Sequence, residues 1–342
     1  FRGWIPEKGL DLIYEVLKDY PTTIIVPKEP EEKEELNVPV ETSKNVFVSS
    51  FQAVVGMYGY PSPKEIDPTL FFIVTFSLFF GIMFGDAGHG LILMLLGLAG
   101  MFARGLKLSV RKMFILLFSV GTASFILGAF VFGEAFGYEL AEIFHVHSIF
   151  GMHYPLLSPV KDISQIFNLV LIIGAIHVAL GLTIRMLNQL YMRKFEELLE
   201  ETWAHMFLYV AILYFLASVN IINFGVSIPS IVFLISLVIG VSLALLGRGI
   251  AWIIIRHKEE SFLSALFGGI GMGIMNLLES FSSFISNTIS YGRLLAMLIA
   301  HSVFLTVINT LAEGTFIIVQ ILILVIGNVF VLALEGLSLI HI

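Results

Sequence analysis

The chain reads Ser290-Tyr291-Gly292-Arg293-Leu294-Leu295-Ala296-Met297-Leu298-Ile299-Ala300-His301 within its longest apolar segment. An arginine inside the hydrocarbon of a membrane costs from about 3 to more than 10 kcal/mol, depending on how far it reaches toward water. At about 100° per residue, six polar side chains fall within an arc of about 100° on one helix face. These are Glu279, Ser282, Ser286, Ser290, Arg293 and His301. This polar stripe must face protein or water rather than lipid.

The composition indicates a polytopic membrane protein. Of the 342 residues, 57% are hydrophobic and only 13% are charged, and the mean hydropathy is +0.94. A soluble domain has about twice that charged fraction. The net charge is −7, and the basic surface typical of a nucleic-acid-binding protein is absent. The chain has no cysteine, which excludes disulfides and thiolate metal sites.

Residues 1–65 are soluble in character, and residues 66–342 are predicted to form the transmembrane domain. A helical pattern extends to about Tyr20, a strand-like run covers Thr22–Val26, and an acidic loop covers Lys28–Asn37. We interpret this part as the edge of a larger cytoplasmic α/β domain, because it is too small for a core of its own. With no initiator methionine and no signal peptide, the chain is expected to be a fragment lacking an N-terminal region.

Eight hydrophobic segments follow, and they predict an all-α protein with eight transmembrane helices. They lie near 70–84, 90–103, 112–132, 166–187, 204–220, 228–250, 264–312 and 315–341. The first two are short for spans of about 20 residues. The turn Gly85-Asp86-Ala87-Gly88-His89-Gly90 separates them, and its three glycines disfavour one continuous helix.

The basic residues predict the orientation. They cluster after the second, fourth and sixth segments: Arg104, Lys107, Arg111, Lys112; Arg185, Arg193, Lys194; Arg248, Arg256, Lys258. The opposite loops carry Glu134, Glu139, Glu142 and Glu313, with Lys161 as their one lysine. By the positive-inside rule both ends of the chain are therefore cytoplasmic.

The seventh segment is too long for a simple span. A helix of about 49 residues would measure roughly 70 Å, more than twice the hydrocarbon thickness. It must therefore tilt strongly, bend or begin outside the membrane. The glycines Gly268, Gly269, Gly271 and Gly273 near its start allow a bend or close packing. A steeply tilted helix with a polar stripe suits a surface pressed against a curved partner.

Arg293 is the leading candidate for a functional charge. The alternative is a structural ion pair with Glu335 of the last segment. Glu279 cannot be that partner within the helix, because 14 residues of helix span about 21 Å. Glu279 and Glu335 are candidates for ion or proton relay, since burial favours their neutral form. Glu279 as an interfacial residue remains open.

The histidines and Asp86 each have two interpretations. His301 titrates near neutrality and can pass protons, or it can bond between helices. Asp86 and His89 can act in function or cap a turn. His145, His147 and His153 have loose spacing, so we predict no metal site there. His177 and Arg185 are expected to pack or to reach the inner surface. No soluble catalytic motif occurs, and no cofactor is expected.

Several motifs resemble the membrane subunit a, also called subunit I, of the V-type and archaeal A-type rotary ATPases. They are Gly3-Trp4-Ile5-Pro6, Met57-Tyr58-Gly59, Glu65-Ile66-Asp67-Pro68-Thr69, Phe79-Phe80-Gly81-Ile82-Met83-Phe84-Gly85-Asp86-Ala87-Gly88-His89-Gly90, Ser290-Tyr291-Gly292-Arg293, Ala300-His301 and Leu334-Glu335-Gly336. The resemblance runs along essentially the whole chain.

The resemblance implies a stator that holds two offset ion half-channels against a rotating ring of proteolipid subunits. By this resemblance Arg293 faces the ring carboxylate, and Glu279, Ser283 and Ser286 line one half-channel. His301, Glu335 and Asp86 would be polar groups near the ion path. The implied partners are the proteolipid ring, the peripheral-stalk and central-stalk-side subunits and membrane lipid, in a prokaryotic cell membrane rather than a eukaryotic vacuole. Where some relatives carry an asparagine and a second histidine, this chain has Ser283 and Asn287.

Two other classes compete with the stator. A free-standing ion-coupled secondary transporter should have inverted repeats and broken helices near the midplane, and no half-to-half repeat is evident. A structural scaffold without an ion path would leave Glu279, Arg293 and Glu335 unexplained. Copurification with a proteolipid ring and soluble ATPase subunits separates the stator from the transporter.

Overall fold

A computed structural model describes residues 4–5, 9–19, 26–28, 43–62, 65–146, 148–149, 151–255 and 261–340. These residues form mostly helices. The α-helices are α1 Leu10–Val16, α2 Val46–Tyr58, α3 Thr69–Met83, α4 Ala87–Phe102, α5 Leu108–Leu127, α6 Leu140–Phe144, α7 Ile163–Tyr191, α8 Phe195–Glu197, α9 Trp203–Ser218, α10 Ser230–Ile255, α11 Phe262–Ser290, α12 Gly292–Ala312 and α13 Ile317–Ile340. The other helical turns are η2 Leu17–Asp19, η4 Gly128–Phe132 and η5 Leu198–Thr202.

The N-terminal part contributes α1, η2 and α2. Helix α2 packs against α3 and α5. The strand-like run predicted over 22–26 lies outside the described residues except for Val26, and so does most of the loop predicted over 28–37. The described N-terminal residues are helical or irregular, so the predicted α/β domain edge stays a prediction.

The predicted break between the first two apolar segments is confirmed. Helix α3 ends at Met83, and α4 begins at Ala87 after a turn through Gly85. The α4–α5 hairpin packs closely because glycines face the neighbouring backbone. A Cβ added at Gly90 would lie 2.3 Å from the Phe125 nitrogen, and one at Gly97 would lie 2.4 Å from the Phe118 nitrogen.

A short irregular loop region follows α5 and η4. Strand β1 (Glu134–Ala135) pairs antiparallel with β2 (Tyr138–Glu139), with Glu134 opposite Glu139. Strand β3 (Ser148–Ile149) pairs antiparallel with β4 (Met152–His153). This region folds back onto α4, since β1 contacts that helix.

Three hydrophobic clusters join the helices. The first brings α3, α7 and α12 together around residues such as Ile82, Val170 and Leu298. The second joins α7, α9 and α11 around Leu171, Tyr209 and Phe284. The third, around Phe84, joins α3 to the α4–α5 hairpin. Helices α3 and α7 each belong to two of these clusters. They therefore link the α4–α5 hairpin on one side to α9 and α11 on the other.

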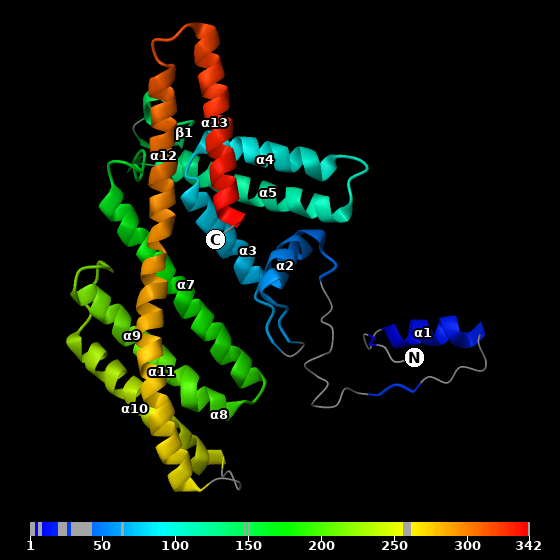
Figure 1. Cartoon of the computed structure of the whole chain (residues 1–342), viewed down its shortest axis with the longest axis vertical. Helices are drawn as coiled ribbons and strands as arrows, with labels where there is room; N and C mark the ends of the chain where they lie inside the picture. The colour runs from blue at the N-terminus through cyan, green and yellow to red at the C-terminus, as the bar shows by residue number, and fades with distance from the viewer. Residues whose placement is uncertain are drawn as a thin grey trace.

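Helices α11 and α12 continue one another and form a rod along the long axis of the molecule (Figure 1). Helix α13 returns beside α12 and is joined to it by a short turn. The α4–α5 hairpin extends to one side and crosses the rod's direction in this view (Figure 1). These helices cannot all be parallel to a membrane normal.

Within the described part of the chain, five helical stretches are long and apolar enough to cross a membrane. They are 108–132, 163–191, 230–254, 262–312 and 317–334. Helices α3, α4 and α9 have 15, 16 and 16 residues. The predicted segments are thus all helical, and the polytopic membrane class is supported, whereas eight complete spans stay a prediction.

Candidate functional site at the rod

The junction of the rod is Tyr291, which separates α11 from α12. Its hydroxyl and the Nδ1 of His177 on α7 form a 2.5 Å hydrogen bond. Its ring also contacts Phe79 of α3, with centroids 5.5 Å apart. The missing side chain of Gly174 makes room for this ring, because an added Cβ would lie 2.4 Å from it. Tyr291 therefore fixes the rotation of the rod against α3 and α7, and His177 packs as predicted.

Arg293 lies two residues beyond Tyr291 and is exposed. Two residues turn a helix by about 200°, so Arg293 and Tyr291 point to opposite sides. The side of α12 that follows Tyr291 is buried in the first cluster through Leu294, Leu295 and Leu298. Arg293 donates to the Ser290 hydroxyl at 3.3 Å. No carboxylate among the described side chains forms an ion pair with it.

The polar stripe continues from Arg293 down α11. Glu279, Ser282, Ser286 and Ser290 are exposed, and Ser283 is half-buried. Asn287 donates to the Ser283 hydroxyl at 3.2 Å. The opposite face of α11 is buried through Phe284 and Thr288, and Thr288 lies 3.3 Å from the Tyr209 hydroxyl. The structure thus brings Glu279, Ser286 and Arg293 onto one open face.

His301 does not share that face. It is 1% exposed and lies on the side of α12 that faces α4. Its Nε2 is 3.3 Å from the Nδ1 of His89, which is also buried. Helices α11 and α12 pack against two different sets of neighbours, so the single stripe predicted from helical periodicity ends near Arg293. His301 belongs to a second polar region.

Asp86 is the centre of that second region. It caps α4, since Oδ1 accepts the His89 amide at 2.8 Å, and its Oδ2 accepts the Gly137 amide at 3.1 Å. Oδ1 also lies 3.9 Å from the His89 ring. The carboxylate is fully buried. The capping interpretation of Asp86 is therefore correct, and the same carboxylate lies within reach of two histidines.

Glu134 is a residue of this region that sequence reasoning did not single out. It is 7% exposed, and the Ser302 hydroxyl donates to both of its oxygens, at 3.2 and 3.0 Å. Burial raises the pKa of Glu134 to about 7, with the Asp86 and Glu139 charges adding to the rise and Ser302 and His301 opposing it. Glu134 follows a long apolar helix, and that context was the one signal of burial available in the sequence.

Glu335 lies on α13, but its side chain is outside what the structure describes. His145 and His153 are exposed, and His147 lies outside the described residues. Arg185 pairs with Glu201 at 2.5 Å near the start of α9.

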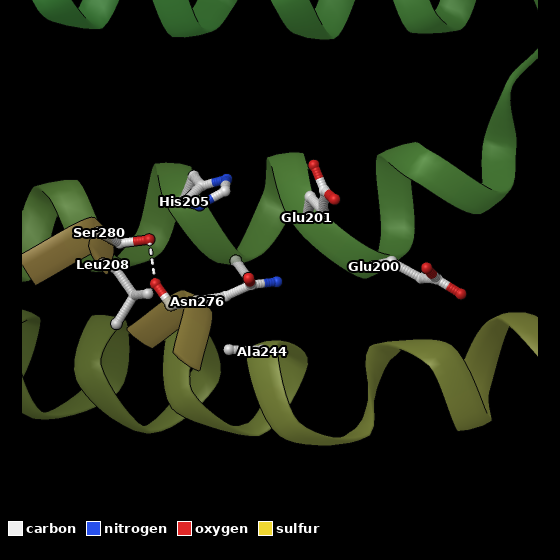
Figure 2. A pocket seen from close by; sticks show the side chains of 8 residues that line it. Glu200, Glu201, His205, Leu208, Ala244, Asn276 and Ser280 are labelled. Carbon is white, nitrogen blue, oxygen red and sulfur yellow. Dashed lines mark hydrogen bonds between the residues drawn. The ribbon is translucent and has the colours of Figure 1, made fainter. Parts of the chain in front are cut away.

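A small pocket is lined by residues of η5, α9, α10 and α11 (Figure 2). It holds about one water molecule and is lined mainly by Glu200, Glu201, His205, Asn276 and Ser280. The His205 Nδ1 is buried and has no hydrogen-bond partner among the described residues. Ser280 is the neighbour of Glu279, so polar groups occupy both sides of α11 at this level.

The fold and these sites define a polytopic helical membrane protein with a fixed positive charge on an open helix face. A family model described as "V-type ATPase 116kDa subunit family" matches residues 1–132. The A-type ATP synthase subunit I of Pyrococcus abyssi is 28% identical over 98% of this chain and 49% of its own length. That of Methanocaldococcus jannaschii is 26% identical over 98% of this chain and 50% of its own length.

A eukaryotic protein is also similar. The vacuolar proton translocating ATPase 100 kDa subunit of Dictyostelium discoideum is 32% identical over 46% of this chain and 20% of its own length. The chain is therefore similar over nearly all of its length to A-type ATP synthase subunit I proteins, and its residues 1–132 match the V-type ATPase subunit family. It spans about half the length of the archaeal relatives.

Proposed function

We propose that the chain is the ion-translocating stator part of a rotary ATPase or ATP synthase and faces a ring of proteolipid subunits. The observation that carries this proposal is the exposed Arg293 on an apolar rod, with no carboxylate partner among the described side chains. An unpaired arginine at membrane depth requires a partner outside the chain. A ring carboxylate meets that need.

The charge on Arg293 has a simple role in this proposal. A ring carboxylate is neutral, with a bound proton or Na⁺, while it faces lipid, because a bare charge there is costly. Near Arg293 the ionised carboxylate is favoured, so the carrier releases its ion. The fixed positive charge also repels cations that would otherwise cross directly between the half-channels. Rotation is then coupled to ion flow.

Two separate polar regions support two half-channels. Glu279, Ser283 and Ser286 would line the one along the open face of α11. Asp86, His301 and Glu335 would lie near the other, and the buried neighbours His89, Glu134 and Ser302 extend that group. The two regions lie on different sides of the rod, which suits paths that do not connect except through the ring.

We further propose eight spans with both ends of the chain cytoplasmic. The basic residues of the α4–α5 turn and of the α7–α8 connection carry this proposal. In Figure 1 the α12–α13 turn lies at the top of the molecule and the α8 region lies in its lower part. In this arrangement the rod would be strongly tilted in the membrane. Such a tilt accommodates a helix too long for a simple span.

The test is ATP-driven ion uptake into vesicles that contain the complete complex with Arg293→Gln. We expect uptake to vanish while the complex still copurifies with its ring. Arg185→Gln is the matched control, because it removes a charge that is paired with Glu201. Uptake near the wild-type rate in the Arg293 variant would contradict the proposal. Purification without any ring or soluble ATPase subunits would favour the secondary transporter.

A further inference from the structure

Three metal-ligating side chains meet in the second polar region, although they come from distant parts of the chain. One ligand atom from each of Asp86, His89 and His301 lies within 4.8 Å of the others. All three side chains are buried, at 0%, 0% and 1% exposure. It is the one such group found among the residues that the structure describes. Two imidazoles and one carboxylate are a ligand set that suits Zn²⁺.

The spacing of the two ring nitrogens fits a shared metal ion. Two nitrogens bound at about 2.0–2.1 Å in a tetrahedral site are about 3.4 Å apart. The Nδ1 of His89 and the Nε2 of His301 are 3.3 Å apart. Asp86 Oδ1 is 3.9 Å from the same Nδ1, so a modest rotation of the carboxylate completes three ligands. A water molecule would occupy the fourth position.

The surroundings hold these ligands in position. Asp86 is fixed by the amides of His89 and Gly137, and a carboxylate that accepts two hydrogen bonds keeps lone pairs for a metal. The other nitrogen of His89, Nε2, is buried without a hydrogen-bond partner, as is Oδ1 of Asn328 on α13. The two side chains interact, so a small rotation would let Nε2–H donate to Asn328. That bond would leave the Nδ1 lone pair for a metal.

Charge also favours a cation at this position. Glu134 interacts electrostatically with both Asp86 and His301. Two carboxylates and two neutral imidazoles would offset the charge of a divalent ion in a poorly solvated setting. Among the described residues, no lysine or arginine forms an ion pair with this group.

We propose that Asp86, His89 and His301 form a binding site for a divalent transition-metal ion such as Zn²⁺, and that its occupancy stops ion movement past His301. The metal would occupy the polar groups beside His301, and its positive charge would repel cations that approach this position. The second part of this inference rests on the proposed function, because it requires His301 to lie on the ion path. The site is enclosed, so the metal is expected to bind slowly.

Zinc itself is the probe. The purified complete complex is incubated with Zn²⁺, passed through a desalting column, and its bound zinc is measured and titrated against a chromophoric chelator. We expect one zinc ion per chain, lost in His89→Gln and in His301→Gln. The exposed histidine in His153→Gln is the control and should leave this zinc bound. Asn328→Ala should weaken binding by roughly 10- to 100-fold.

Wild-type protein gives a test that needs no variant. The X-ray absorption spectrum of the bound zinc should show two imidazole ligands with nitrogen and oxygen at about 2.0–2.1 Å. Absence of bound zinc, or zinc with oxygen ligands alone, would overturn the site. So would equal affinity in wild type and in both ligand variants.

The regulatory part is measured separately. Ion uptake by the wild-type complex should fall slowly after zinc addition and recover with a chelator, and His153→Gln should behave in the same way. Zinc bound at these residues with unchanged uptake would overturn the inhibition. The Arg293→Gln experiment needs no zinc, so a failure of the proposed function is distinguished from a failure of the metal site.

Discussion

Tyr291 packs its ring into the space left by Gly174, and its hydroxyl is 2.5 Å from the Nδ1 of His177. Both contacts join the junction of the rod to a single face of α7. Because Arg293 follows Tyr291 by two residues, the same contacts determine that the arginine faces outward. The position of the charge thus depends on packing that involves no charged group.

The first prediction concerns that packing. Gly174→Ala would put a Cβ 2.4 Å from the Tyr291 ring, so we expect a loss of about 1–3 kcal/mol of stability from overpacking. Ion uptake should fall as well, because the rod must shift. Gly181→Ala on the same helix is the matched control, since an added Cβ there meets nothing within 4 Å. Melting temperatures and uptake rates of the two complexes provide the comparison. Equal behaviour would show that Tyr291 is not held by this contact.

The second prediction concerns the cap of α4. Asp86→Ala removes the acceptor for two backbone amides in a fully buried position. Each unsatisfied buried donor costs about 1–3 kcal/mol, so we expect a large fall in thermal stability. Asn45→Ala removes the cap of α2, where the accepting side chain is exposed, and should cost only about 1 kcal/mol. A smaller effect at Asp86 than at Asn45 would refute this account.

The third prediction is a dependence on pH. The pKa of Glu134 rises from 4.5 in its ordinary state to about 7 in the fold, because burial disfavours the charged carboxylate. Because the acid pKa is raised, the folded state keeps this proton up to a higher pH than the unfolded state does. The contribution of Glu134 to the free energy of unfolding is therefore complete below about pH 4.5 and is lost as the pH rises to about 7. Glu134→Gln keeps a neutral side chain throughout.

The stability of Glu134→Gln relative to wild type should therefore grow between pH 4.5 and 7, by up to about 3 kcal/mol. Melting temperatures of the two complexes across this range measure the difference. Glu142→Gln is the control, since that side chain is exposed, and it should show no such growth. A constant difference for Glu134→Gln would mean that the carboxylate is ionised in the fold throughout this range.

The fourth prediction concerns the open face of α11. Glu279→Gln removes the one carboxylate on the same exposed stripe as Arg293 among the described side chains. If it lines a half-channel, uptake should fall roughly tenfold or more, which is about 1.4 kcal/mol on the barrier. Thermal stability should not change, because the side chain is exposed. Glu313→Gln, in the exposed turn after α12, removes the same charge and should leave uptake intact. Unchanged uptake with Glu279→Gln would support the interfacial interpretation.

The sequence by itself determined the membrane class and the positions of the apolar helices, and it singled out Arg293 as a candidate. These follow from local properties: hydropathy over about 20 residues and the cost of a charge among apolar neighbours. The break at Gly85 was also evident, because glycines disfavour a helix wherever they cluster. The length of the rod followed from its uninterrupted apolar run.

Only the tertiary structure decided which polar residues meet. Periodicity put His301 on the Arg293 face, but packing against α4 turns it toward His89, and Asp86 and Glu134 join it from other parts of the chain. A helical pattern gives angles around one axis and says nothing of which neighbouring helix covers each side. Arg293 could be recognised from its own surroundings, whereas the Asp86–His89–His301 group exists only because separate helices pack together.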